Sequence, residues 1–203
     1  MAGELKGAPT PVRLPAAVLP RGHEKVTFRW EYRDRDVLAR GEGRALVAPP
    51  DSVRLDFAVA GGMGSGYAWL FGDTVVSGGG GGSARIKRYL PPPVLLWAAL
   101  GRFQVLALDT TVRMDGDTLR ADLRSGGADV TKSIVWRVAF AGSEGDGKLV
   151  GLERLVAGRV RETVVRRKNS DIRFDNPAAG RSLTLTHVRS DTVAEIDPEL
   201  WHR

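Results

Sequence analysis

The stretch Val26-Thr-Phe-Arg-Trp-Glu-Tyr32 alternates apolar and polar side chains without a break. Successive side chains of a strand point to opposite faces, so this alternation predicts a strand with one apolar and one water-facing side. The same period recurs over residues 52–60. Between them, the Gly- and Ala-rich stretch 37–47 predicts a strand whose small residues leave space beside bulkier neighbours. Short links between the three strands predict an antiparallel meander.

Further strands are predicted along most of the remaining chain. Gly72-Asp73 and Asp115-Gly116 are turn signals between short apolar runs, which indicates hairpins. Residues 148–167 fit helical spacing, but their Val and Thr content favours two strands broken near Gly158. The other predicted strands are 67–71, 74–77, 111–114, 118–123, 132–140 and 182–188.

One short helix is predicted at Val94–Leu100, where apolar residues are continuous instead of alternating. Pro91-Pro-Pro93 before it and Gly101 after it are start and stop signals. A helix that is apolar all round is stable in water only if it is buried, so we expect it in or across a concave sheet.

The composition favours a single globular domain. The chain has 203 residues, 42% of them hydrophobic, with 25 Gly and no Cys, which excludes a disulfide scaffold and a thiolate metal site. Prolines at 9, 11, 15 and 20 predict an extended lead-in over residues 1–22, followed by one domain over 23–203. Gly78–Gly82 predicts a flexible loop. Asp197–Trp201 predicts a capped turn that tucks an aromatic ring against the domain.

No catalytic or metal-binding constellation is present in the sequence. His23, His187 and His202 are isolated from one another, so no metal site is predicted. Ser65 follows a glycine but precedes a strand, which does not fit a nucleophile elbow. We therefore predict no catalytic residue, no metal and no cofactor.

The formal charge of +6 raises the question of nucleic acid, because Arg159, Arg161, Arg166, Arg167 and Lys168 form a basic strip. Stacking on bases needs aromatic residues between the basic ones, and here the aromatic residues lie elsewhere. We expect these arginines on solvated outer faces and no nucleic-acid partner. A nucleic-acid interface along this strip is the weaker alternative.

Two stretches, Ser52–Ser77 and Tyr89–Gly101, resemble the LolA/LolB-like lipoprotein carriers and receptors. The resemblance rests on motifs in the same order as in the receptor branch: a strand, an apolar loop, a strand with a Gly-Asp turn, and a Pro-rich entry to a short helix. These are Arg54-Leu-Asp-Phe57, Gly62-Met63-Gly64, Tyr67 to Phe71 with Gly72-Asp73, and Leu90-Pro-Pro-Pro-Val-Leu-Leu-Trp97. The five-Gly insert and the lack of a Cys for acylation depart from the family pattern.

The resemblance implies a mainly β (α+β) fold: a strongly curved antiparallel sheet, forming an open half-barrel of about ten or eleven strands. Short helices would cover an apolar hollow that holds acyl chains, with no catalytic step and no cofactor. It also implies a monomer in the periplasm or on the periplasmic face of the outer membrane, as a lipoprotein whose signal is missing from this chain. Met63, on the protruding loop, would make peripheral contact with the membrane.

The residues themselves leave two functions open. A curved sheet capped by one short helix often leaves a gap that acyl chains can fill, which predicts binding or transfer of lipoprotein acyl chains or free lipid. The same apolar face could instead be the filled core of a structural or protein-binding β-domain of the cell envelope. The residues predicted to bind the ligand are Phe28, Trp30, Tyr32, Leu55, Phe57, Trp69, Phe71, Leu96, Leu100, Trp136 and Val138.

Overall fold

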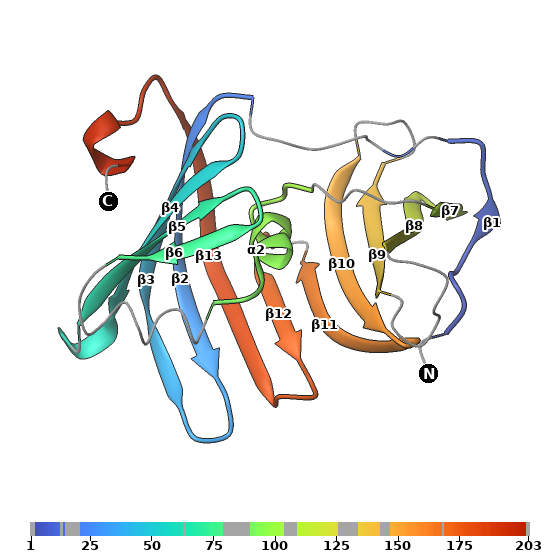
Figure 1. The fold of residues 1–203 in the computed structure, drawn as a ribbon, viewed down its shortest axis with the longest axis horizontal. Helices are drawn as coiled ribbons and strands as arrows, with labels where there is room; N and C mark the ends of the chain where they lie inside the picture. The colour runs from blue at the N-terminus through green and yellow to red at the C-terminus, as the bar shows by residue number, and fades with distance from the viewer. Residues whose placement is uncertain are drawn as a thin grey trace.

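The computed structural model describes residues 3–12, 14, 21–62, 64–78, 90–103, 109–125, 134–142, 147–167 and 169–201. Within these residues one sheet of thirteen strands runs through the molecule, and every pair of neighbouring strands is antiparallel. The order is β1-β7-β8-β9-β10-β11-β12-β13-β2-β3-β4-β5-β6. The two end strands do not pair with each other, so the sheet is open, as Figure 1 shows.

The elements have the following bounds in chain order. The strands are β1 (Ala8–Pro9), β2 (His23–Arg33), β3 (Leu38–Ala48), β4 (Ser52–Val59), β5 (Ser65–Phe71), β6 (Thr74–Ser77), β7 (Asp109–Asp115), β8 (Thr118–Ser125), β9 (Ile134–Ala141), β10 (Lys148–Val156), β11 (Arg159–Arg166), β12 (Ile172–Asn176) and β13 (Arg181–Val193). The helices are η1 (Ala60–Gly62), α2 (Pro93–Ala99) and η2 (Pro198–Trp201).

The predicted fold class, a curved open antiparallel sheet, is confirmed, while the strand number is corrected from ten or eleven to thirteen. β1 was not predicted because it has only two residues, and β12 was missed although Ile172 to Asp175 alternate apolar and polar side chains. The two-strand interpretation of residues 148–167 is confirmed. Ala157 and Gly158 join β10 to β11 with φ of 49° and 68°, and two successive positive φ values are typical of the tight hairpin turn.

The small residues of β3 accommodate the aromatic side chains of β2. Trp30 lies opposite Gly41 and Phe28 lies opposite Gly43 in the ladder. A Cβ on Gly43 would lie 2.5 Å from the Phe28 ring, so the ring covers the glycine backbone. Phe57 of β4 then meets both rings edge-on, at 6.3 Å between centroids. The predicted space beside bulky neighbours is therefore filled by aromatic rings.

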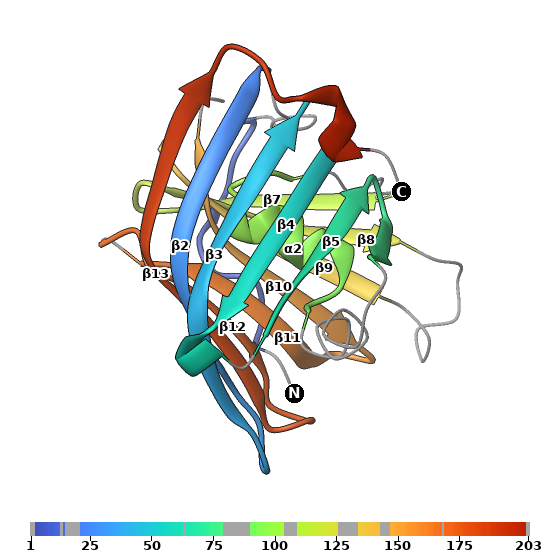
Figure 2. The ribbon, with the colours of Figure 1, turned by 90° about the vertical axis from the view of Figure 1, so that its left-hand side faces the viewer.

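Irregular pairings near the middle of the sheet account for its curvature. The register shifts between β9 and β10, between β10 and β11, and between β13 and β2. In the last of these His187 adopts a φ of 52°. A β-bulge bends its strand and increases the local twist. The sheet therefore curves around α2, so that β2–β6 and β7–β10 lie on opposite sides of the helix (Figures 1 and 2).

Helix α2 lies in the concave face, as the sequence predicted. It is seven residues long, and Leu95, Leu96, Trp97, Ala98 and Ala99 are all buried. It packs against β10, β11 and β12, and Gly101 ends it with a φ of 74°. None of the helices in the described ranges is long and apolar enough to cross a membrane.

Part of the predicted lead-in belongs to the sheet. Ala8 pairs with Met114 and Pro9 with Arg113, which makes β1 the edge strand beside β7. Leu5 is buried just before it. The division into a lead-in over 1–22 and one domain over 23–203 stays a prediction.

The close approach of β4 to β3 at Gly41 predicts that Gly41→Ala destabilises the protein. A Cβ at this position would lie 1.8 Å from the Ala58 carbonyl oxygen, so backbone must move. We expect a loss of about 1–3 kcal/mol in the free energy of unfolding, the range found for overpacking, measured by urea denaturation.

Gly151→Ala is the matched control for this measurement. It also lies in a strand, but the nearest atoms to its Cβ would be 3.7 Å away, which is ordinary contact. We expect a change within about 0.5 kcal/mol there. Equal losses for both variants would contradict the proposed role of Gly41.

Candidate functional site

Most of the predicted ligand-binding residues lie together on the concave face, in one apolar cluster with α2. Phe28, Trp30, Tyr32, Leu55, Leu96 and Val138 are buried in this cluster, and Phe57, Leu100 and Trp136 are partly buried against it. They come from β2, β4, β9 and α2 and its C-terminal turn. The alternation read from the sequence therefore assigned these side chains to the correct face.

The concave face is closed by its own side chains in this conformation. Trp30 is 8% exposed and Val138 is fully buried, and both belong to the same buried cluster as Leu95 of α2. An acyl chain therefore reaches the centre of this face only if α2 or a neighbouring side chain moves. Of the predicted residues in this cluster, Phe57, Leu100 and Trp136 are half-buried and already touch solvent.

Two polar contacts attach α2 to distant parts of the sheet. The Trp97 indole Nε1–H donates to the Gly72 carbonyl oxygen at 2.7 Å, in the turn between β5 and β6. Arg166 of β11 donates from Nη2 to the Ala99 carbonyl oxygen at 2.9 Å. These contacts and the apolar packing hold the helix across the concave face.

Trp69 and Phe71 do not belong to the concave face, which corrects the sequence interpretation. The Trp69 indole donates to the Leu200 carbonyl oxygen at 3.1 Å, and the Phe71 ring lies 6.5 Å from Trp201. Both residues therefore point to the outer face, where the C-terminal segment packs. The alternation was misread because β5 is apolar on both faces, and its inner face is formed by the small Ala68 and by Leu70.

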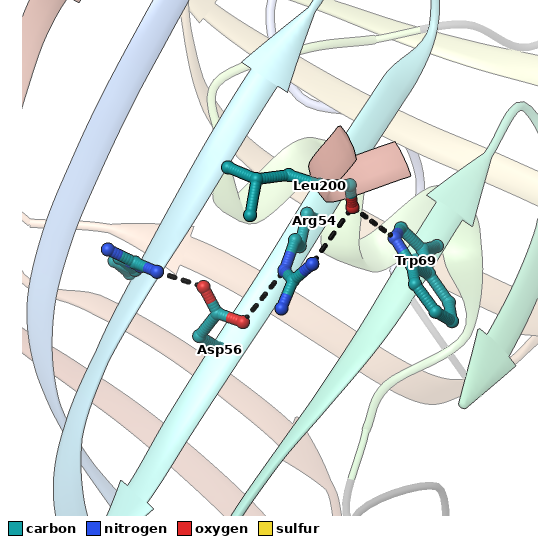
Figure 3. A network of polar contacts seen from close by, with 5 residues as sticks. Arg54, Asp56, Trp69 and Leu200 are labelled. Atoms are coloured by element: carbon teal, nitrogen blue, oxygen red, sulfur yellow. Dashed lines mark hydrogen bonds and ion pairs between the residues drawn. The ribbon is translucent and has the colours of Figure 1, made fainter. Parts of the chain in front are cut away.

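Arg54 anchors the C-terminal segment on this outer face (Figure 3). Its Nη1 donates to the Leu200 carbonyl oxygen at 2.9 Å, and its Nε donates to Asp56 at 2.9 Å. Its guanidinium carbon also lies 4.8 Å from the centre of the Tyr67 ring, a cation–π distance. The predicted capped turn at the end of the chain is confirmed, since the Glu199 amide donates to Asp197 Oδ1 at 2.9 Å.

Met63, the predicted membrane contact, lies outside the described residues, as do residues 79–82 of the five-Gly loop. Among the residues that are described, no group of three or more His, Asp or Glu side chains is arranged to hold a metal ion.

Charged side chains also face the concave side, and sequence reasoning missed them. Glu162 is 5% exposed and bonds Arg154 and Asn176. Glu24 pairs with Arg102, the residue that follows the C-terminal turn of α2. Arg166 lies on the same face as Val164 in β11, so its predicted place on a solvated outer face was wrong. The strand alternation of residues 159–166 was the signal that could have shown this.

The electrostatics of Arg166 reflect this position. Burial lowers the pKa of its guanidinium from the ordinary value, and the positive charge of Arg102 lowers it further. An arginine remains charged at any physiological pH. Arg166 therefore places a positive charge close to the apolar face, where, among the described residues, it bonds a neutral carbonyl oxygen and not a carboxylate.

Comparisons with known proteins give structural similarity alone. No family model and no curated protein matches the sequence. The fold is similar to a domain from Vibrio parahaemolyticus provisionally assigned as an outer membrane lipoprotein-sorting protein, with a TM-score of 0.49 and 6% identity over 88% of each chain. It is also similar to a DUF1329 family protein from Desulfovibrio piger, with a TM-score of 0.45 and 11% identity over 90% of this chain and 91% of that one.

The packing of α2 predicts that Leu95→Ala strongly destabilises the protein. Leu95 is fully buried, and removal of its side chain leaves a cavity beneath the helix. We expect a loss of about 2–5 kcal/mol in the free energy of unfolding, measured by urea denaturation.

Leu38→Ala is the control, because Leu38 is 61% exposed at the start of β3. We expect a change within about 0.5 kcal/mol for this variant. A near-neutral Leu95→Ala would mean that α2 is not packed on the sheet in solution.

Proposed function

We propose that the protein is a non-enzymatic binder of acyl chains, which it accepts on the concave face of its sheet. The observation that carries the proposal is that, among the described residues, a single seven-residue helix covers a large aromatic and branched apolar face. A second sheet or a long helix would make such a cover permanent. Here the described contacts that attach α2 include two single hydrogen bonds, from Trp97 and Arg166.

The driving force for binding would be the removal of apolar surface from water. Movement of α2 would expose apolar side chains of the cluster on the strands it packs against, β10, β11 and β12, and an acyl chain lying along them would replace the contacts that the helix gives up. Burial of apolar surface contributes about 25 cal/mol per Å², so a long acyl chain can offset the loss of the packing of two helical turns. No covalent step and no cofactor are needed.

The finer assignments rest on the family resemblance. They are acceptance or transfer of lipoprotein acyl chains, a location in the periplasm or on the periplasmic face of the outer membrane, a monomeric state, and membrane contact through Met63. Each of these is part of the proposal.

The competing function is a structural or protein-binding β-domain with a filled core. The burial of Trp30 and Val138 in the apolar cluster favours it, because a face closed by its own side chains needs no ligand. The two functions differ in one measurable property, which is whether an acyl chain enters the fold.

Native mass spectrometry of the protein purified from cells, with lipid extraction in parallel, tests the proposal directly. We expect a bound lipid, or uptake of a fluorescent fatty-acid probe by the empty protein with a shift in its emission. Protein that is reproducibly empty and that takes up no probe would establish the filled-core alternative.

Trp136→Ala is predicted to weaken probe binding about tenfold, because Trp136 is a partly exposed aromatic residue of the concave face. The measurement is a titration of the probe followed by its fluorescence. Trp201→Ala is the matched control, since it removes the same side chain from the outer face. The same loss of affinity in both variants would contradict binding on the concave face.

A further inference from the structure

Two arginines lie next to each other at the C-terminal end of α2. Arg102 follows the Leu100-Gly101 turn that ends the helix, and Arg166 reaches the helix from the end of β11 by its hydrogen bond to the Ala99 carbonyl oxygen. A Cβ on Gly101 would lie 3.3 Å from Arg166 Nη2, so this guanidinium packs closely on the turn that ends the helix.

Positive charge exceeds negative charge at this place. Arg102 is paired with Glu24, whose other carboxylate oxygen accepts a hydrogen bond from Ser190 at 3.2 Å. Arg166, in contrast, bonds a neutral carbonyl oxygen. Among the described residues, only one of the two guanidinium groups is therefore bonded to a carboxylate, which leaves an excess of about one positive charge.

Both arginines also carry a donor that is not used. The Nε atoms of Arg102 and Arg166 are buried from solvent and have no hydrogen-bond acceptor. A buried N–H group without an acceptor is unfavourable, and most such groups in folded proteins have a partner. An anionic oxygen would accept hydrogen bonds from these donors and would also balance the excess positive charge.

We propose that Arg102 and Arg166 bind the anionic headgroup of an amphiphile whose acyl chain lies on the concave face, an inference that rests on the proposed function. A carboxylate and a phosphate both match the guanidinium group, which presents its donors in a rigid planar fork. The site adjoins Leu96 and Leu100 of the apolar cover, so headgroup and chain would be held at one end of α2. The ligand class is then an acidic lipid.

The test compares three ligands that have the same chain and different headgroups: dodecanoate, dodecyl phosphate and the neutral dodecan-1-ol. Each displaces a neutral fluorescent probe from the full chain, at a pH where the carboxylate is ionised. We expect at least one anion to displace the probe at about tenfold lower concentration than the alcohol. The stronger of the two anions identifies a carboxylate or a phosphate headgroup.

Arg166→Met and, separately, Arg102→Met should reduce the preference for the anion to less than about twofold while displacement by the alcohol is kept. The preference is a ratio within one protein, so a partial loss of stability does not change it. Arg166→Lys retains the charge and should retain part of the preference. Arg159→Met is the matched control, because Arg159 is exposed on the same strand, and should behave as the wild type.

The outcomes separate the two proposals. Equal displacement by all three ligands, unchanged by the arginine variants, overturns the headgroup site and leaves acyl-chain binding intact. An anion preference that persists in both Met variants also overturns the site. Failure of the wild type to bind the probe or any of the ligands overturns the proposed function, and the headgroup site with it.

Discussion

An open sheet with an apolar concave face is stable in water only if something covers that face. In a sandwich a second sheet does this, and in a barrel the sheet closes on itself. Here the described structure uses curvature and one short helix: the bulged pairings bring the two ends of the sheet around α2, and Leu95 to Ala99 fill the space between them. The aromatic side chains pack on the glycines of β3 to fill the concave face, and Arg166 holds the end of α2 over it.

The sequence predicted the fold class and most strands because alternation is strong where one face is buried and the other is charged, as in residues 26–32. It predicted α2 because Pro91-Pro-Pro93 and Gly101 delimit a continuous apolar run. It failed at β5, where Trp69 and Phe71 face outward, because a strand that is covered on both sides has no polar face to orient it. It also missed β12, although Ile172 to Asp175 alternate apolar and polar side chains, so this strand was within reach of the sequence.

The charged residues of the concave face were the least predictable part of the candidate site. Arg166 lies in a run of arginines whose composition is that of a solvated surface, and its position two residues from Val164 has meaning only once residues 159–166 are known to form a strand. Glu24 and Arg102 are far apart in the sequence, and only the fold brings the segment after α2 close enough to the start of β2 for them to form an ion pair. This ion pair depends on tertiary structure and leaves no local pattern.

The edge strand β1 has a consequence for how copies of this protein meet. A sheet that does not close exposes backbone amides and carbonyls at its ends, and these can recruit a strand from another molecule. At the β7 end the chain covers its own edge with two residues, and one of them, Pro9, has no N–H group to donate. The open half-barrel is therefore protected at this end against growing into a continuous intermolecular sheet, a safeguard that closed barrels do not need.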